Sequence, residues 1–290
     1  MIKSISLSVA LLLLLSAGFV AAENIPAYAF HLFSYPGASS TSAFGISNKN
    51  VVVGVYTDSQ GQVHGYTLTG KKFSQLDCPD GTATYPVSIN SSGIIVGYYI
   101  DSSNNSFAFY YSNGVCTNIP GPTGAPPTAA YGINDDNVIS GEYFDPGAGQ
   151  NEGWIWTLNG TGYTIVLSPK SGGPASAFDT NVHGITTVQW EDVISWDASL
   201  YNDNTFNYTA ANVPGAANSY IHAIDDSGDT VYSWQDSSGF HGAVQIEGTF
   251  TTFNGPGCSG TYADGINNNH IIVGQCAQSD TVGEGFYVRY

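Results

Sequence analysis

A repeated phrase is the feature that most constrains how this chain can fold. "SINSSGIIVGYY", which begins at Ser88, returns as "GINNNHIIVGQC" at Gly265, and related segments occur around Ile46, Ile133 and Ile224. The copies are spaced by about 44 residues, and the one double-length gap holds a degenerate copy, "DTNVHGITTVQW". Six copies at this period predict a protein built from six structural repeats.

Each copy contains four short runs that are typical of β-strands. In the second copy they are "TYPVSIN", "GIIVGYY", "SFAFYY" and "VCTNIPG", separated by turn sequences such as "NSSG" and "DSSNN". The β-branched and aromatic content, with almost no helical period, favours antiparallel strands. Four strands in a repeat of this length are typical of a propeller blade. We therefore predict an all-β, six-bladed β-propeller.

The two ends of the chain indicate how such a ring closes. The last copy ends at Tyr290 after its third run, so its blade lacks an outer strand. "YAFHLFSYPGASS" from Tyr28 resembles "TAANVPGAANS" from Thr209, which closes an earlier repeat. We expect the N-terminal strand to complete the sixth blade, which removes exposed strand edges and makes residues 23–290 one domain. A linear β-solenoid is the alternative, but it gives no reason for a split last repeat.

The first 22 residues, "MIKSISLSVALLLLLSAGFVAA", have the organisation of a secretory signal. A basic residue precedes an apolar run that ends on small residues, and this run is too short to favour a membrane span. We therefore expect residues 1–22 to be removed and the protein to be secreted. Its formal net charge of -17 predicts an acidic surface, which repels phosphate backbones and anionic lipids, so nucleic acid and membranes are poor partners.

The cysteines and the glycosylation sequons are interpreted in the light of this export. No two cysteines have the spacing of metal ligands, and an oxidising compartment favours disulfides. Among the three possible connectivities we prefer the sequential one, which pairs Cys78 with Cys116 and Cys258 with Cys276. In a eukaryotic host, four sequons would accept glycans, at Asn90, Asn104, Asn159 and Asn207.

An Asn or Asp recurs in the turn between the first two strands of each repeat. A ring of such side chains invites a calcium site, but an Asx side chain in this position also caps its own backbone. We favour the structural role and predict no metal. The six positions are Asn48, Asn90, Asn134, Asn181, Asp225 and Asn267.

Positions that vary between repeats are better candidates for function, because the blade itself does not require them. Two positions before the isoleucine of each repeat, the copies carry Phe44, Val87, Tyr131, Phe178, His222 and Asp264. Two positions earlier still, they carry Ser42, Tyr85, Ala129, Ser176, Tyr220 and Tyr262. If the inner strands line the channel, its entrance gathers aromatic rings with one histidine and one aspartate. His222 and Asp264 would then lie on adjacent blades, near enough to pair and orient the imidazole. The alternative is a His222 that is simply buried between blades.

The repeats also resemble an extracellular family named after its His-Ala-Phe motif, whose units pair an Ile-Asn turn with an "HGF"-like run and "PGA". The matching segments are "HGY" at His64, "EGW" at Glu152, "HGA" at His241 and "EGF" at Glu284, with "PGA" at Pro36 and Pro214. This resemblance implies the propeller architecture and says little about activity.

The sequence carries none of the familiar catalytic motifs: "GxSxG", "HExxH" and a phosphate-binding Gly-Lys loop are all absent. We therefore expect no cofactor. A reaction that needs only shape, stacking and a hydrogen bond, such as a cycloaddition, remains compatible with this chain. The overall organisation, with "YPGA" at Tyr35, a signal, sequons and six aromatic-rich repeats, resembles the fungal hetero-Diels–Alderases of tropolonic sesquiterpene pathways.

The second resemblance implies a secreted cyclase that joins a tropolone ortho-quinone methide to a humulene-type alkene. In this hypothesis His222 and Tyr131 are catalytic, and hydrophobic or aromatic substrates bind against six further residues. These are Phe44, Tyr85, Phe178, Tyr220, Tyr262 and Asp264. The alternative is a secreted binding propeller without catalysis, whose ligand is a glycan or a cell surface.

Overall fold

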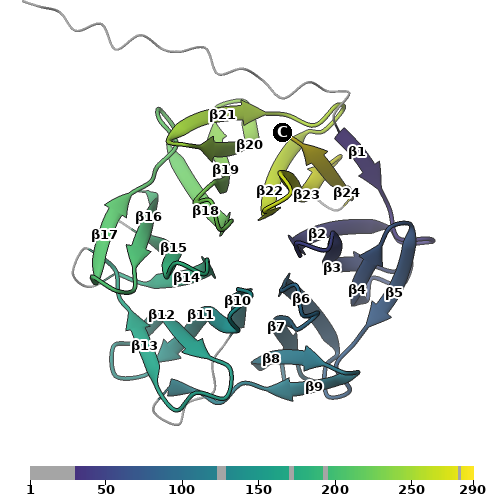
Figure 1. Cartoon of the computed structure of the whole chain (residues 1–290). Coiled ribbons are helices and arrows are strands. Elements are labelled where there is room, and N and C mark those ends of the chain that lie inside the picture. Colours follow the sequence, from purple (N-terminus) through teal and green to yellow (C-terminus); the bar gives the residue numbers. More distant parts are fainter. Residues whose placement is uncertain (1–29, 123–128, 170–172, 192–194, 280–281) are drawn as a thin grey trace, which may run out of the picture.

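Six antiparallel sheets form a closed ring in the computed structural model (Figure 1). The model describes residues 30–122, 129–169, 173–191, 195–279 and 282–290. All regular elements in these ranges are strands, and each sheet has four of them, so the all-β, six-bladed propeller is confirmed. The expected signal at residues 1–22 lies outside the described residues. No helix within these ranges has the length and apolar character needed to cross a membrane.

The blades follow one another along the chain, each running from an inner strand beside the central axis to an outer one (Figure 1). Blade 1 consists of β2 (Ser40–Ile46), β3 (Val51–Thr57), β4 (Val63–Thr69) and β5 (Lys72–Leu76). Blade 2 consists of β6 (Ala83–Ile89), β7 (Ile95–Ile100), β8 (Ser106–Ser112) and β9 (Val115–Asn118). Blade 3 consists of β10 (Ala129–Ile133), β11 (Val138–Asp145), β12 (Gln150–Thr157) and β13 (Tyr163–Val166).

The second half of the ring repeats this order. Blade 4 consists of β14 (Ala175–Thr180), β15 (Ile185–Glu191), β16 (Trp196–Asn202) and β17 (Asn207–Ala210). Blade 5 consists of β18 (Asn218–Ile224), β19 (Thr230–Asp236), β20 (Gly239–Ile246) and β21 (Thr249–Phe253). Blade 6 contains β22 (Gly260–Asn267), β23 (Ile271–Ala277) and β24 (Gly283–Arg289), and its outer strand is β1 (Phe30–Phe33).

The N-terminal strand closes the ring, as the sequence predicts. β1 pairs antiparallel with β24 (Figure 1). In this pairing Phe30 lies opposite Val288. The Phe30 ring packs 5.2 Å from that of Phe286 and 5.9 Å from that of Phe253, so β1 also contacts the neighbouring blade 5. The first and last described strands therefore share one sheet, which leaves no open end in the ring.

The hydrophobic core lies mainly between neighbouring blades. One cluster joins Val231 and Val244 of blade 5 to Ile272 and Phe286 of blade 6, and equivalent clusters occur around the ring. Apolar surface that faces another blade is removed from water, which is the dominant favourable term in folding. The inner strands are consequently held rigidly around the axis.

The turns after the inner strands confirm the structural role of the Asx residues, with one correction. The Oδ1 atoms of Asn90, Asn134, Asn181, Asp225 and Asn267 each accept backbone N–H groups two and four residues later. In blade 1 this position belongs to Ser47, whose Oγ accepts the N–H of Val51. The assignment of Asn48 was wrong by one residue, because serine can form the same turn and the alignment relied on the Asn.

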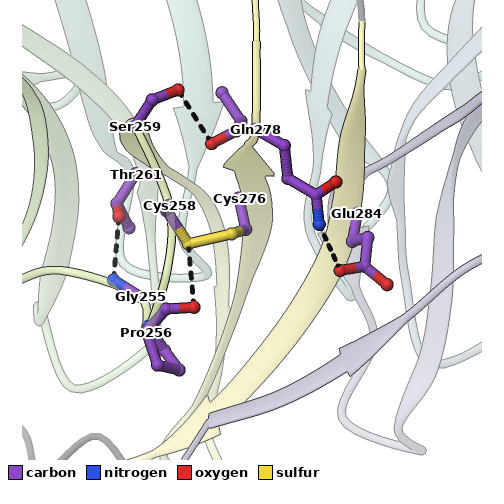
Figure 2. Close-up of a disulfide and its surroundings, with 9 residues drawn as sticks. Gly255, Pro256, Cys258, Ser259, Thr261, Cys276, Gln278 and Glu284 are labelled. Atoms are coloured by element: carbon purple, nitrogen blue, oxygen red, sulfur yellow. Dashed lines mark hydrogen bonds between the residues drawn. A yellow bond between two sulfur atoms is a disulfide. The ribbon is translucent and has the colours of Figure 1, made fainter.

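Both predicted disulfides are present and join the expected partners. Cys78 bonds Cys116, and Cys258 bonds Cys276. Figure 2 shows the second of these beside the Gly255 N–H, which donates to the Oγ1 of Thr261 at 2.8 Å. In each case the cross-link ties the segment that enters a blade to a strand of that same blade.

Candidate functional site

A β-bulge interrupts every inner strand at the same position. The register between the first two strands shifts by one residue in each blade, leaving one inner-strand residue without a partner on the second strand. A bulge of this kind re-aims a side chain, and here all six bulged residues line one central cavity. They are Phe44, Val87, Tyr131, Phe178, His222 and Asp264.

The cavity has a volume of about 260 Å³ and lies on the ring axis, at the end where the inner strands enter their turns. Its wall is divided in two. Blades 1 to 4 contribute Phe44, Val87, Tyr131 and Phe178, and the Tyr131 and Phe178 rings stack at 4.9 Å with an interplanar angle of 9°. These four bulged side chains form an apolar, mostly aromatic part of the wall.

Blades 5 and 6 contribute the polar half. The Nδ1 of His222 lies 3.9 Å from the Oδ1 of Asp264, so the two side chains are neighbours without a direct hydrogen bond. Burial lowers the pKa of His222 to about 4 and raises that of Asp264 to about 7. The imidazole is therefore neutral at pH 7. Its buried Nε2 has no hydrogen-bond partner among the described residues.

A second buried carboxyl group, Asp179, also lines the cavity, and sequence reasoning missed it. Its Oδ1 accepts the N–H of Thr180 at 3.0 Å, and its Oδ2 accepts the N–H of Ile224 in the next blade at 3.1 Å. Burial outweighs these bonds and raises its pKa to about 7. The other repeats carry Gly, Ser or Ala here, so the rule that singled out His222 would have found Asp179 one position further on.

The mouth of the cavity is ringed by amide and carboxylate side chains that hydrogen-bond between blades. Asp135 accepts the backbone N–H of Ser91 at 2.7 Å, and Asp226 accepts that of Val182 at 3.2 Å. Asn48 donates from Nδ2 to Asp135, and its Oδ1 accepts the N–H of Asn268. No cluster of three His, Cys, Asp or Glu side chains with the geometry of a metal site exists in the described part of the chain.

The structure places the predicted site residues in two groups. Phe44, Tyr131, Phe178, His222 and Asp264 line the cavity together, as their common position on the inner strands suggests. The other three are not among the cavity-lining residues, because they lie two residues farther from the turns along the same strands. They are Tyr85, which stacks on Tyr98 at 4.7 Å, and Tyr220 and Tyr262, which flank the ring of Phe240 at 6.0 and 4.9 Å.

The hydroxyl group of Tyr131 is already engaged. It donates to the Oε1 of Glu142 at 2.8 Å, and burial with the nearby carboxylate raises the Tyr131 pKa well above its usual value. The hydroxyl group of Tyr131 is therefore already hydrogen-bonded, and its ring stacks on that of Phe178 in the wall.

The four predicted glycosylation sequons differ in accessibility. Asn104, Asn159 and Asn207 are exposed. Asn90 is only 3% exposed, and its Nδ2 donates to the carbonyl of Asn134 and to the Oδ1 of Asn137. Glycosylation of all four sequons stays a prediction, and the folded blade encloses the Asn90 amide to which a sugar would be attached.

The ring and its axial cavity define a six-bladed β-propeller whose central cavity is of mixed polarity. Solved structures with this architecture include a TolB-like protein from Agrobacterium tumefaciens, with TM-score 0.59, 11% identity and coverage of 87% of this chain and 91% of that one. The Aleuria aurantia lectin in complex with Fucalpha1-6GlcNAc matches with TM-score 0.51, 12% identity and coverage of 86% and 91%. A gluconolactonase from Xanthomonas campestris matches with TM-score 0.51, 11% identity and coverage of 92% and 94%.

These similarities establish the fold alone, because the identities are low and the functions differ. No protein-family model matches the chain, and no curated protein does. The comparisons therefore support neither the His-Ala-Phe repeat nor the hetero-Diels–Alderase resemblance. Function has to be argued from the cavity itself.

Proposed function

We propose that the protein binds one small molecule, with an apolar body and a hydrogen-bonding end, in the axial cavity. The observation that carries this proposal is the ring of bulged residues, in which every blade turns one side chain into the same cavity. A mostly apolar wall with a few convergent polar groups is the usual composition of a small-molecule site. This is the binding-propeller alternative, with its ligand placed on the axis.

The volume of the cavity supports a single ligand of modest size. At about 260 Å³ it lies just below the range of ~300–1,000 Å³ that is typical of pockets for drug-sized ligands. The apolar body of the ligand packs against Phe44, Val87 and Phe178. Its polar end reaches His222, whose unpartnered Nε2 offers either a donor or an acceptor, depending on the tautomer.

Export of the protein belongs to the same proposal. The two disulfides support it, because disulfides persist in oxidising compartments and are rare in the cytosol. The ligand would then be met outside the cell or in the secretory route.

Filling the cavity tests the proposal directly. Val87→Phe adds a ring inside the cavity, whereas Val115→Phe makes the same change at a site that is 59% exposed on the outer strand β9. We expect small aromatic molecules or sugars, screened by ligand-observed NMR, to bind the wild type and Val115→Phe. Val87→Phe is expected to weaken binding by about tenfold or more, the equivalent of ~1.4 kcal/mol. Equal binding by both variants would place the ligand elsewhere, and a screen without any ligand would remove the proposal.

Catalysis is the second candidate function, and the unpartnered imidazole favours it. A tropolone ring stacked near Phe178 would place its carbonyl near His222, which could donate a hydrogen bond and accelerate a cycloaddition. Two observations make this hetero-Diels–Alderase the weaker candidate. The cavity suits one small molecule better than two coupling partners, and the hydroxyl group of Tyr131 is committed to Glu142.

The catalytic candidate is tested by generating a tropolone quinone methide beside a humulene-type alkene, with and without protein. Acceleration that yields one dominant stereoisomer and is lost in His222→Ala would establish a cyclase. Products that match the spontaneous mixture would leave the binding function alone.

A further inference from the structure

We propose that the ligand of the axial cavity is an organic cation, a small ammonium compound whose charged nitrogen binds at Asp264. This inference rests on the proposed binding function and names the chemical class of its ligand. It is argued from the charged groups around the cavity and from the Asp264 carboxyl group, which has no salt bridge to a lysine or arginine among the described residues.

Asp264 forms no salt bridge with a lysine or arginine among the described residues. Its side chain is only 16% exposed, and its Oδ1 lies 3.9 Å from the Nδ1 of His222. The imidazole cannot supply a positive charge at neutral pH, because burial lowers its pKa to about 4. No lysine or arginine is among the residues that line the cavity. A buried carboxylate in this state favours a bound cation, since a counter-charge would offset the cost of burial.

The remaining acidic groups act in the same direction. Asp179 lies in the wall, on the blade that precedes His222, and Asp135 and Asp226 lie at the mouth. With a formal net charge of -17, the whole molecule attracts cations and repels anions, and a cleft lined by one sign of charge concentrates its field there. An anionic ligand is therefore the class most strongly disfavoured.

The apolar half of the wall distinguishes an organic cation from a metal ion. Phe44, Tyr131 and Phe178 contribute aromatic rings. Aromatic rings attract a positive charge to the ring face, and they also pack well against the carbon atoms of a ligand. These rings cannot ligate a metal, and no cluster of three His, Cys, Asp or Glu side chains that could hold one exists within the described ranges. An ammonium group on a carbon body matches both halves of the wall at once.

The test compares three probes that share one ring and differ in charge: benzylamine, benzyl alcohol and benzoate. Calorimetry or ligand-observed NMR at about pH 7.5 measures their affinities for the wild type. We expect benzylamine to bind about tenfold or more tightly than benzyl alcohol, and benzoate to bind most weakly, because only the cation pairs with the carboxylate. This comparison needs no variant. The butyl series, with butylamine, butanol and butyrate, repeats it for a smaller body.

The variant Asp264→Asn then assigns the preference to one residue. It keeps the shape of the side chain and is expected to abolish the advantage of the amine while leaving the affinity for benzyl alcohol within about threefold. Asp80→Asn, an exposed aspartate outside the cavity, is the matched control and is expected to change neither.

The outcomes separate this inference from the proposed function. If neutral probes bind as tightly as amines, and the Val87→Phe variant loses both, the axial site stands and the inference is overturned. Retention of the amine preference in Asp264→Asn would also overturn it. If nothing of any charge binds, both proposals fail together.

Discussion

At the scale of single residues, the hydrogen bonds between neighbouring Asx turns show where a buried polar atom has no hydrogen-bond partner. The Nδ2 groups of Asn90, Asn134, Asn181 and Asn267 each donate to a backbone carbonyl in the next blade. Asp225 stands at the same position but has no amide hydrogen to donate. Its side chain is buried, and its Oδ2 has no partner among the described residues. The side-chain hydrogen bond of this position is therefore absent between blades 5 and 6, although Asp226 and Asn268 still hydrogen-bond across the same boundary.

This gap predicts that Asp225→Asn stabilises the protein. The asparagine keeps the Oδ1 that accepts the N–H groups of Ser227 and Asp229, and it adds a donor toward the carbonyl of Asn267. Satisfying a buried polar atom is worth about 1 kcal/mol, or a rise in Tm of about 2–4 °C in a chain of this size. Calorimetry measures the shift. The reverse change, Asn134→Asp, removes an existing 3.0 Å bond and is expected to lower Tm; stabilisation by both changes would refute the argument.

At the scale of strands, each blade has one position where a small residue on one of its two middle strands lies opposite a larger residue on the other. In blades 1, 2, 3 and 6 a glycine on the second strand lies opposite an aromatic residue on the third, whereas blades 4 and 5 reverse the sizes. The first type is Gly54–Tyr66, Gly97–Phe109, Gly141–Trp154 and Gly274–Phe286, and the second is Val188–Ser199 and Tyr232–Ala243. One large side chain per pair thus fills the space beside the bulge.

The glycine of this pair is expected to resist substitution. A Cβ on Gly97 would lie 2.0 Å from the carbonyl oxygen of Tyr85 on the inner strand, so the backbone next to the bulge would have to move. Gly97→Ala is expected to cost about 1–3 kcal/mol, as overpacking does. Gly162→Ala is the control, because a Cβ there meets no atom within 4 Å, and its cost is expected to stay within about 0.5 kcal/mol. Urea unfolding compares the two, and equal midpoints would contradict this view of the bulge.

At the scale of the whole molecule, the features that the sequence predicted are those encoded locally. Turn chemistry, strand composition and the missing last run suffice to place the blades and the closing strand β1. The β-bulges could not be predicted from local sequence, because a one-residue shift in register depends on how two strands pair. Ser47 was missed because serine can take the place of asparagine in the turn, and Tyr85 lies outside the cavity because it is two residues farther from the turn than the bulged residue. Asp179 escaped notice because its repeat is the most degenerate one.

The buried titratable groups also determine how the whole protein responds to pH. Burial raises the pKa values of Asp179 and Asp264 to about 7 and that of Asp203 to about 6, and it also raises the pKa of Asp225. Between about pH 4 and 7 the folded state therefore holds protons that the unfolded chain has released, so stability increases as pH falls through this window. His222 opposes this: its pKa of about 4 keeps it neutral in the folded state while the unfolded chain gains a proton below about pH 6.5.

Four carboxyl groups with raised pKa values against one imidazole with a lowered one give a net gain in stability on acidification, so the protein is expected to be most stable between about pH 4 and 6. Each group changes the free energy of unfolding by at most about 1.4 kcal/mol per pH unit.

Below this window stability is expected to fall, because hydrogen bonds from Ser238 and His241 lower the pKa of Asp236 and its protonation breaks them. Urea unfolding from about pH 3 to 8 measures the profile. Asp264→Asn removes one of these four carboxyl groups and is expected to flatten the slope between about pH 5 and 7. Stability that rises steadily from pH 5 to 8 would show that these carboxyl groups are not buried as described.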